Sequence, residues 1–260
     1  MQAEWVMVTG ASAGIGRELS KIFAGHRHNL VLVARDEARL AALGDELTRQ
    51  HGVQVRVLAR DLSRPGAASE IFSELQKQGV RISILVNNAG FGTRGAFAKG
   101  DAAAYREMIE VNVTALVELT HLFMRPMVEQ GRGRILNLSS TAAFQPGPMM
   151  AIYYATKSFV SSFSYALANE LKGTGVTVTT LCPGPTRTEF QQRAGKTDSE
   201  KAYRAWWAME ARDVAEIGYR GLMAGKRVVI PGLINWLGCR LTRIAPTRLA
   251  AGVARKVIEG

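Results

Sequence analysis

"TGASAGIGRE" (residues 9–18) follows directly on the apolar run WVMVTG (5–10) and places glycines at positions 10, 14 and 16. Glycines at a turn from a strand into a helix let the backbone approach a pyrophosphate, and the start of the helix offers free N–H groups. The spacing is G-x-x-x-G-x-G, a relative of the usual G-x-G-x-x-G fingerprint. The stretch predicts a dinucleotide site, with a tight structural turn as the alternative. The expected contacts are Gly10, Ser12, Ala13, Gly14, Ile15 and Gly16.

The rest of the chain repeats this order of a short strand and a longer helix. Apolar residues at helical spacing occupy 15–27, 36–50, 67–78, 105–130, 153–172 and 211–225. Short apolar, β-branched runs lie at 5–10, 29–35, 53–60, 82–90, 133–140, 176–184 and 226–232. The alternation predicts an α/β fold, with a seven-stranded parallel sheet flanked by helices, in a single domain over 1–260. Ligands of such open sheets bind beyond the carboxyl ends of the strands.

The end of the second strand indicates which dinucleotide is bound. A site for NAD places an acidic side chain there, on the 2′-hydroxyl of the ribose. Here Ala34 closes the strand and Arg35 follows, while Arg17 ends the glycine-rich turn. Two guanidinium groups suit a 2′-phosphate, so we predict that NADP(H) is preferred over NAD(H). Asp36 is the complication, because its carboxylate would reach the hydroxyl if the strand ended two residues later.

Asp61 and Leu62 lie in RDLS (60–63), which closes the third strand, and both are predicted cofactor contacts. The Asp61 carboxylate is expected to accept a hydrogen bond from the adenine amino group, or to cap the next helix. The two roles are compatible.

The net charge of +11 is concentrated near the end of the chain, where residues 220–260 hold eight Lys and Arg but only one Glu. Basic surfaces attract nucleic acid, acidic lipid or acidic proteins. No aromatic-interleaved RNA motif, zinc finger or basic zipper accompanies this one, so we expect no nucleic-acid partner. A solvated basic surface is the simplest interpretation. The alternatives are weak contacts with a membrane surface or with an acidic carrier protein.

Cysteine usage and hydropathy indicate the compartment. Cys182 and Cys239 form no metal-ligand spacing and no disulfide framework, which is typical of a reducing compartment, and we expect no metal. Residues 1–9 are too short and too acidic for a secretory signal. The apolar run at 228–239 contains proline and glycine and is shorter than the ~20 residues of a spanning helix. We therefore predict a soluble, cytoplasmic protein.

A candidate catalytic pair lies in AIYYATKSF (151–159). On a helix, Tyr153 or Tyr154 would share a face with Lys157, which follows them by four and three residues. A nearby ammonium stabilises a phenolate, which would let the phenol exchange a proton at neutral pH. The spacing alone does not decide between the two tyrosines, or between chemistry and packing.

The chain resembles the classical short-chain dehydrogenase/reductase family over essentially its whole length. The matching pieces stand in family order: TGASAGIG (9–16), DL (61–62), NNAG (87–90), Asn112 in EVNV, Ser140 in ILNLSS, YYATK (153–157) and PGPTRTEF (183–190). The resemblance implies a doubly wound, Rossmann-like domain that transfers hydride between a nicotinamide and a carbonyl or alcohol. Its Y-x-x-x-K motif selects Tyr153 with Lys157 and leaves Tyr154 as a neighbour.

The resemblance also implies four catalytic residues. The family's serine precedes its tyrosine by thirteen positions, which selects Ser140. Reducing a ketone puts negative charge on its oxygen, so the site needs a proton donor and a polarising group. Tyr153 would donate the proton and Ser140 would hydrogen-bond the same oxygen. Lys157 would stabilise the tyrosinate and hold the nicotinamide ribose, and Asn112 would position a water that relays protons to Lys157.

Further cofactor contacts follow from the same resemblance. NNAG is expected to shape the wall beside the adenine ribose, and PGPTRTEF to meet the carboxamide and phosphates, with Pro183 and Gly184 fixing its turn. The predicted contacts are Asn87, Asn88, Ala89, Gly90, Pro183, Gly184, Thr186 and Thr188, together with Tyr153 and Lys157.

Substrate groups are expected from 91–97, 141–150 and 190–209, the last within an insertion at about 185–211 that would form a lid. Apolar, adaptable side chains there favour a hydrophobic or 3-oxoacyl ketone, with packing of the lid as the alternative. They are Phe144, Met149, Met150, Phe190, Trp206 and Trp207. Arg94 and Arg193 would bind a carboxylate or phosphate, or remain solvated.

The basic tail at about 233–260 is expected to contain an amphipathic helix that Pro246 begins. Leu249, Val253 and Val257 would form its apolar stripe, suited to acidic lipid, to the core or to a subunit interface. The helices at 101–130 and 151–172 are long enough to pair between subunits, so we predict a homo-oligomer, a dimer or tetramer. The alternative to catalysis is a protein that binds NADP(H) as a redox sensor or scaffold. Such proteins commonly lose the tyrosine or lysine, which this chain retains.

Overall fold

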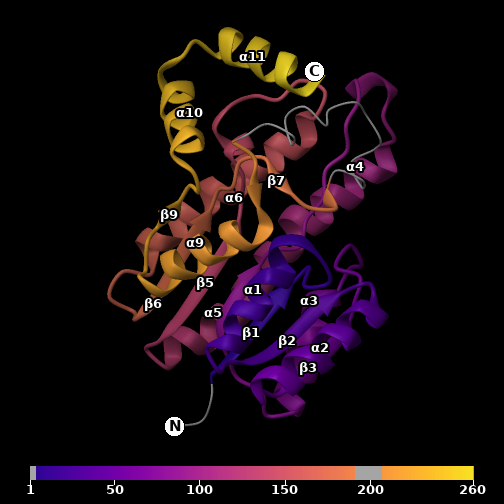
Figure 1. The fold of residues 1–260 in the computed structure, drawn as a ribbon, viewed down its shortest axis with the longest axis vertical. Coiled ribbons are helices and arrows are strands. Elements are labelled where there is room, and N and C mark those ends of the chain that lie inside the picture. The colour runs from indigo at the N-terminus through magenta and orange to yellow at the C-terminus, as the bar shows by residue number, and fades with distance from the viewer. Residues whose placement is uncertain (1–3, 191–206, 260) are drawn as a thin grey trace.

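The structure, a computed structural model, describes residues 4–190 and 207–259. Its centre is a parallel sheet of seven strands in the order β3-β2-β1-β4-β5-β6-β9. The strands are β1 (Trp5–Thr9), β2 (Asn29–Ala34), β3 (Val55–Ala59), β4 (Ile82–Asn87), β5 (Gly133–Leu138), β6 (Val176–Leu181) and β9 (Val228–Val229). Each lies inside one of the seven predicted runs, so the predicted α/β fold is confirmed (Figure 1).

Helices cover both faces of this sheet because side chains of successive strand residues point to opposite faces. Met7 packs into a cluster with residues of α3, α5 and α6, whereas Val6 and Val8 pack with α1, α2 and α9. All three strand residues are fully buried. The covering helices are α1 (Gly14–Gly25), α2 (Glu37–His51), α9 (Ala211–Met223), α3 (Ala67–Lys77), α5 (Ala115–Glu129) and α6 (Ala151–Glu170). The buried rows on both sides make one doubly wound domain.

The helix predicted over 105–130 is divided into three pieces. It consists of α4 (Ala102–Ile109), a π-helical turn (Glu110–Thr114) and α5. The extra residue of a π turn shifts the helix face, and such turns are frequent at functional sites. The turn carries Asn112, whose side chain bonds both the N–H and the C=O of Phe91, at 3.0 and 2.9 Å. Sequence periodicity does not reveal this interruption.

The predicted insertion at about 185–211 is described only at its two ends. β7 (Thr186–Arg187) and β8 (Met209–Glu210) pair in parallel and form a second, two-stranded sheet that was not predicted. Arg187 also forms an ion pair with Glu210 at 2.7 Å. The ends of the insertion are therefore held together beside the main sheet. Arg193 and Trp206 lie outside the described residues.

The tail forms two helices, α10 (Leu233–Ile244) and α11 (Thr247–Glu259). The prediction of a helix near Pro246 is confirmed, with its first residue at Thr247, whereas α10 was not predicted. Figure 1 places both helices at the end of the molecule toward which the strands of the main sheet point. Among the described residues, none of the helices has the length and apolar character needed to cross a bilayer.

Candidate active site

The candidate site lies where the order of strands in the sheet reverses. β1 pairs with β2 on one side and with β4 on the other, so the sheet is built outward from β1 in both directions. In open α/β sheets, ligands bind beyond the carboxyl ends of the strands at such a point. The glycine-rich turn follows β1, and NNAG closes and follows β4. The two predicted nucleotide-binding segments therefore meet here.

Asn88 ties the glycine-rich turn to the end of β4. Its side-chain nitrogen donates to the backbone oxygens of Thr9 at 2.8 Å and Gly10 at 3.2 Å. A Cβ at Gly10 would lie 2.8 Å from that nitrogen, and a Cβ at Gly16 would collide with it. Gly10 also has a φ of 65°, which favours glycine. Close packing within the protein therefore requires both glycines and holds the turn in one shape.

The start of α1 is suited to an anion. No side chain caps its first turn, so the N–H groups of that turn remain for a ligand. Thr188 lies over the same turn, because a Cβ at Gly14 would be 3.2 Å from Thr188 Cγ2. The glycine turn, the uncapped helix start and the threonine together fit the pyrophosphate of a dinucleotide.

The two arginines predicted to read a 2′-phosphate each pair with a separate carboxylate. Arg17 lies 3.6 Å from Glu46 of α2, and Arg35 Nη1 lies 3.0 Å from Glu107 Oε1 of α4. All four side chains are partly exposed. The two guanidinium groups therefore share no carboxylate. The carboxylate partners were not found from the sequence, because they lie on other helices.

Asp36 caps the helix that follows β2, a role that was not predicted for it. β2 ends at Ala34, as predicted, and the Asp36 side chain accepts a hydrogen bond from the Arg39 N–H at 3.0 Å to cap α2. Arg39 in turn pairs with Glu189, at 2.7 Å between Nη1 and Oε2. This pair connects the first turn of α2 to the segment after β7, and neither residue was singled out in the sequence.

Asp61 closes a turn and does not cap α3. Its carboxylate accepts hydrogen bonds from the N–H and the hydroxyl of Ser63, at 3.0 and 2.8 Å, whereas α3 begins six residues later behind Gly66. Burial raises the pKa of this carboxyl, but the Ser63 hydrogen bonds and the charges of Arg35 and Arg64 outweigh burial and lower the pKa below its usual value. Asp61 is therefore an anion near Arg35.

Asn112 and Lys157 converge on Gly90. A Cβ at this glycine would lie 3.0 Å from Asn112 Oδ1 and 3.4 Å from Lys157 Nζ. The ammonium donates to the backbone oxygen of Leu138 at 2.8 Å, which fixes it at the end of β5. Asn112 holds the backbone of Phe91, so its amide shapes the loop after β4. The structure brings two of the four predicted catalytic residues together at this point.

Tyr153 lies on the same side, next to Gly92. A Cβ at Gly92 would be 3.0 Å from Tyr153 Cδ2, 3.1 Å from Phe190 Cζ and 3.2 Å from Met150 Cε. The Tyr153 ring also lies 5.8 Å from Lys157 Nζ. The phenol is therefore placed between the ammonium and two apolar side chains from predicted substrate segments.

Tyr154 has a different environment. Its ring packs against Gly147 so closely that any Cβ at that position would overlap it. Met149, two residues before α6, has a φ of 69°, which is unusual for a residue with a side chain. Tyr154 thus packs against the loop before α6, and Tyr153 is left to face Gly92.

Ser139 lies in the core, whereas Ser140 lies at the candidate site. Ser139 is 2% exposed and donates to the backbone oxygen of Lys157 at 2.9 Å, which fastens α6 to β5. Ser140 is less buried, and its hydroxyl accepts from the Ala142 N–H at 3.1 Å and lies 3.4 Å from the Pro183 oxygen. The long second contact leaves the Ser140 hydroxyl available to another acceptor.

Burial lowers the pKa of Lys157 to about 8, because desolvation disfavours the ammonium. The nearby Cys182 thiol is also buried, and burial raises its pKa to about 12. Cys182 is therefore neutral at pH 7 and does not supply the lysine with a counter-charge. The ammonium is held by its hydrogen bond to Leu138, in a position where a phenolate would stabilise it strongly.

Comparisons with known proteins agree with this geometry. The family model described as short chain dehydrogenase matches residues 4–199. The chain belongs to the short-chain dehydrogenase family. It is 38% identical to sulfoacetaldehyde reductase 2 of Chromohalobacter salexigens over 217 residues, which are 82% of this chain and 85% of that protein. The predicted family membership and oxidoreductase class are confirmed.

Two solved structures are similar to this short-chain dehydrogenase along most of its length. One is a short-chain dehydrogenase from Sphingobium yanoikuyae in complex with NADPH, with 36% identity, a TM-score of 0.81, and coverage of 92% of this chain and 93% of the other. The second is the bulky-bulky ketone specific alcohol dehydrogenase from Comamonas testosteroni, with 30% identity, a TM-score of 0.79, and coverage of 94% and 93%. The likeness confirms the Rossmann-like fold.

In this short-chain dehydrogenase, the PGPT turn packs against a residue that lies outside all the sequence motifs. Asn235 of α10 lies directly against Gly184, where any Cβ would overlap its amide. The Asn235 side chain donates to Pro231 O at 2.8 Å and is 8% exposed. Thr186 Oγ1 donates to Gly184 O at 2.9 Å within the same turn. The tail therefore contacts the candidate cofactor site.

Asn87 does not reach the surface of the candidate site. Its amide nitrogen donates to Thr120 Oγ1 and to Asn137 Oδ1, both at 2.9 Å, and the residue is 3% exposed. The side chain therefore joins β4, β5 and α5 inside the domain. Asn88, Ala89 and Gly90 are the members of NNAG that lie at the strand end.

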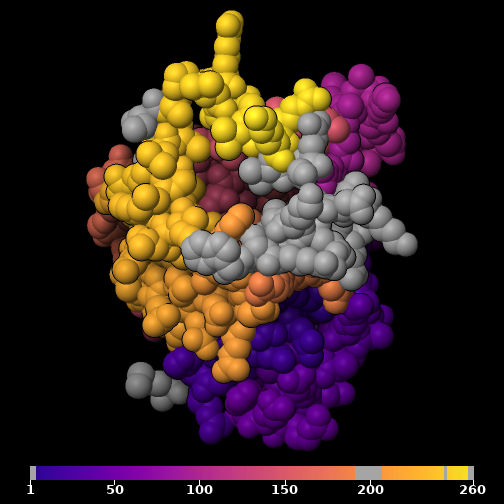
Figure 2. All heavy atoms as spheres, turned by 45° about the horizontal axis from the view of Figure 1, so that its top comes forward, coloured from indigo at the N-terminus to yellow at the C-terminus, as the bar shows by residue number. Residues whose placement is uncertain are grey.

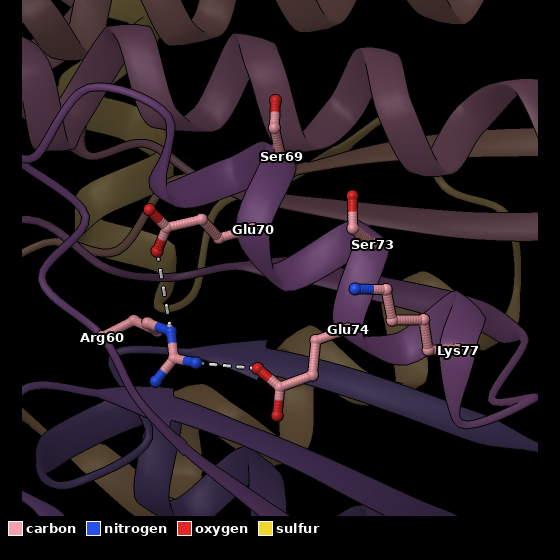
Figure 3. A pocket seen from close by; sticks show the side chains of 6 residues that line it. All are labelled: Arg60, Ser69, Glu70, Ser73, Glu74 and Lys77. Atoms are coloured by element: carbon pink, nitrogen blue, oxygen red, sulfur yellow. Dashed lines mark hydrogen bonds and ion pairs between the residues drawn. The ribbon is translucent and has the colours of Figure 1, made fainter.

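A hollow of about 520 Å³ lies away from these residues, beside α3. Figure 3 shows its lining: Arg60, Ser69, Glu70, Ser73, Glu74 and Lys77. Arg60 pairs there with Glu74 at 2.7 Å and with Glu70 at 4.0 Å. None of the six is a candidate site residue, and three of the charged ones, Arg60, Glu70 and Glu74, already pair with one another, so size alone does not mark the active site.

Proposed function

We propose that this short-chain dehydrogenase is an NADP(H)-dependent reductase that converts an apolar ketone to a secondary alcohol, with Tyr153 as the proton donor. The observation that carries the proposal is the convergence of Tyr153, Met150 and Phe190 on Gly92, beside the buried ammonium of Lys157. It combines a proton donor, a cation that stabilises its conjugate base, and apolar walls for a substrate.

The cofactor fit is supported by the protein's own packing. The glycine-rich turn is held in one shape by Asn88, and the first turn of α1 has no side-chain cap. When bound, the nicotinamide cofactor supplies the hydride. Arg17 and Arg35 would hold a 2′-phosphate by exchanging their present carboxylate partners for it, since a phosphate bears more charge than a carboxylate. The NADPH bound to the Sphingobium relative supports this preference.

Proton transfer would proceed through residues of α6 and β5. The Tyr153 phenol donates its proton to the carbonyl oxygen as negative charge develops there. The Ser140 hydroxyl donates a hydrogen bond to the same oxygen, which Ser139 cannot do because its hydroxyl is used inside the domain. The Lys157 ammonium stabilises the tyrosinate that remains. Asn112 bonds the backbone of Phe91 and thereby fixes the loop after β4 that borders the site.

The apolar walls support the choice of substrate class. Met150 and Phe190 present flexible and aromatic surface to Tyr153, which suits a bulky hydrophobic group on the ketone. The bulky-bulky ketone specificity in the name of the Comamonas relative agrees with this. We propose that the insertion at about 185–211, whose ends β7 and β8 hold together, closes over such a substrate. A 3-oxoacyl compound is the alternative substrate within this class of apolar ketones.

The proposal includes an oligomer and a compartment. Val128 of α5 and Phe159 of α6 are 37% and 43% exposed, which supports pairing of these helices in a homodimer or homotetramer. Multi-angle light scattering of the wild type and of the pair Val128→Asp, Phe159→Asp tests it: a smaller particle in the variant is expected, and an equal one contradicts it. Both cysteines are buried thiols outside any disulfide, which supports a reducing, cytoplasmic location.

The substrate class is tested by a carbonyl panel with NADPH. It should contain small diketones, bulky aryl ketones, long-chain 3-oxoacyl compounds and a short sulfonated aldehyde of the kind in the Chromohalobacter relative's name. We expect the highest kcat/KM with bulky or long-chain ketones. Preference for the short anionic aldehyde would contradict the proposed substrate class while leaving the reductase class intact.

A further inference from the structure

The two tail helices leave an unusual amount of apolar surface exposed. On α10, the outward-facing side chains are Leu233, Ile234, Trp236, Leu237 and Leu241, of which Leu233 is 75% exposed and Leu241 is 57% exposed. On α11, Leu249 and Val253 are 65% and 61% exposed. Single exposed apolar residues need no explanation, but a contiguous set on consecutive helices does.

Each helix is amphipathic, with the apolar residues on its outer face. Asn235 and Cys239, four residues apart, form the buried side of α10, and Leu233, Leu237 and Leu241 repeat at the same interval on the opposite side. Ala250 and Ala254 form the buried side of α11. The buried sides of both helices therefore carry small or polar residues, whereas the large apolar residues are exposed.

Cationic side chains are interleaved with these apolar ones. Arg240 lies on the outer face of α10, with its guanidinium carbon 4.8 Å from the ring centre of Trp236. Arg248 and Lys256 are exposed on α11. From residue 233 to residue 258 the chain contains five Lys and Arg and no Asp or Glu. We call the outer face of α10 and α11 the tail surface.

We propose that the tail surface docks on an anionic lipid bilayer. Apolar side chains would enter the boundary between headgroups and acyl chains, while the arginines and Lys256 would meet lipid phosphates. Tryptophan next to arginine is suited to this depth, because one part of the pair is apolar and the other is charged. The helices would lie in the bilayer surface, since neither has the length to span it.

Charge decides between a bilayer and a second copy of the chain as the occupant. In a two-fold symmetric pair the same patch meets itself, so Arg240, Arg248 and Lys256 of one copy would face the same three cations of the other, with no acidic residue between 233 and 258 to offset them. An anionic bilayer offers the opposite sign over the whole surface. The net charge of +11 adds a long-range attraction to it.

Docking in this manner would orient the enzyme. α10 and α11 lie at the end of the molecule where the strands of the main sheet terminate, and Figure 2 shows their atoms as the outermost ones at this end. The inner side of α10 contacts Gly184 of the candidate site through Asn235. The site end of the molecule would therefore face the lipid, from which an apolar substrate can be taken up.

The test is flotation of the full chain with vesicles, because binding is then measured without any assay of turnover. The probes are vesicles of phosphatidylcholine alone and of phosphatidylcholine mixed with phosphatidylglycerol, at about 0.01 M and about 1 M salt, where the Debye length is ~30 Å and ~3 Å. We expect flotation with the anionic vesicles at low salt. Equal flotation with both vesicle types, or none with either, would overturn the proposal.

A double charge variant and a matched control test whether the tail surface is the binding site. Arg240→Gln with Arg248→Gln should lower the partition coefficient roughly 30-fold, since each cation contributes about 1 kcal/mol near an anionic surface. Arg49→Gln with Arg81→Gln removes the same charge at exposed positions before β3 and β4 and should bind like the wild type. Equal weakening by both pairs would show that only net charge matters and would overturn the proposal.

Leu237→Ser with Leu241→Ser tests the apolar part and separates it from self-association. We expect this variant to lose flotation at least tenfold, with unchanged thermal melting and an unchanged particle mass by light scattering. If instead the wild type ignores anionic vesicles and the variant has a smaller particle mass, the tail surface is an interface between copies and the lipid proposal is wrong.

Discussion

The ammonium of Lys157 lies 5.8 Å from the ring centre of Tyr153, one helical turn away on α6. The same ammonium is anchored to Leu138 O at the end of β5, and Ser139 fastens the backbone of Lys157 to that strand end. The helix therefore cannot rotate or slide without losing buried hydrogen bonds. A rigid cation beside the phenol is what a tyrosine needs to release a proton and stay charged afterwards.

Tyr153→Phe removes the proton donor and keeps the ring that contacts Phe190 and Met150. We expect kcat to fall by roughly 10²- to 10⁴-fold, the range for loss of a general acid, with the Kd of NADPH unchanged. Tyr154→Phe is the matched control, since Tyr154 packs on Gly147, and should keep its kcat. Steady-state kinetics that gave both variants the wild-type kcat would exclude Tyr153 as the donor.

Arg35→Ala should discriminate between the two nicotinamide cofactors. The loss of a charge-assisted contact to a 2′-phosphate costs about 1.5–3 kcal/mol, so the Kd of NADPH should rise roughly 10- to 100-fold while that of NADH changes little. Glu107→Gln is the control, because it removes the present partner of Arg35 and should not weaken NADPH. Fluorescence titrations in which NADPH and NADH lost affinity equally would show that Arg35 does not read the phosphate.

Gly16→Ala and Gly238→Ala separate a glycine needed for packing from one that is not. A Cβ at Gly16 would collide with the Asn88 amide and lie 2.5 Å from Gly10 O, so we expect a loss of about 1–3 kcal/mol in the free energy of unfolding. Gly238, on α10, has no atom within 4 Å of its Cβ position and should gain up to about 1 kcal/mol on the same change. Urea unfolding measures both, and a harmless Gly16→Ala would contradict the rigid turn.

The buried lysine predicts a pH dependence of stability. Burial lowers the pKa of Lys157 to about 8 from 10.5, so between these pH values the unfolded chain holds a proton that the folded chain has released. The free energy of unfolding from this group therefore rises with pH through that window. Below this pH window, burying the charged Lys157 lowers the free energy of unfolding by about 3 kcal/mol, at ~1.36 kcal/mol per unit of pKa shift.

Lys157→Met removes this dependence. The stability of the variant minus that of the wild type should fall by about 3 kcal/mol from roughly pH 7 to roughly pH 10.5, because only the wild type gains stability from losing a buried charge. A constant offset from the lost bond to Leu138 cancels in the comparison. Lys172→Met, at an exposed lysine just after α6, should give a flat difference. A flat difference for Lys157→Met would mean that its ammonium is not desolvated.

The sequence allowed the fold to be predicted because each strand is a short apolar run bounded by turn residues. It also located the turn after β1, the end of β2 at Ala34 and the catalytic candidates in order, since these are local motifs. Three features depend on distant contacts and were not predictable. They are the π turn at Asn112, which Phe91 stabilises from another loop, the ion pair of Arg35 with Glu107, and the ion pair of Arg39 with Glu189.

The tail illustrates a second limit. Proline and glycine in 228–239 obscured a helix that begins only at Leu233, after Gly232 with a φ of 86°. Its role in supporting Gly184 through Asn235 could not be found from periodicity, because it depends on how α10 is placed against a turn about fifty residues earlier. Helix amphipathicity predicted the apolar face of α11, but not which face is buried.

The most direct measurement of the central claim is a titration of the purified protein with NADPH and with NADH, followed by turnover of a bulky apolar ketone at saturating NADPH. Absorbance of the reduced nicotinamide reports the reaction. We expect NADPH to bind more tightly than NADH and to be oxidised in proportion to the alcohol formed. Tight NADPH binding without turnover of any carbonyl in the panel would contradict the reductase and would favour a sensor that holds the cofactor without using it.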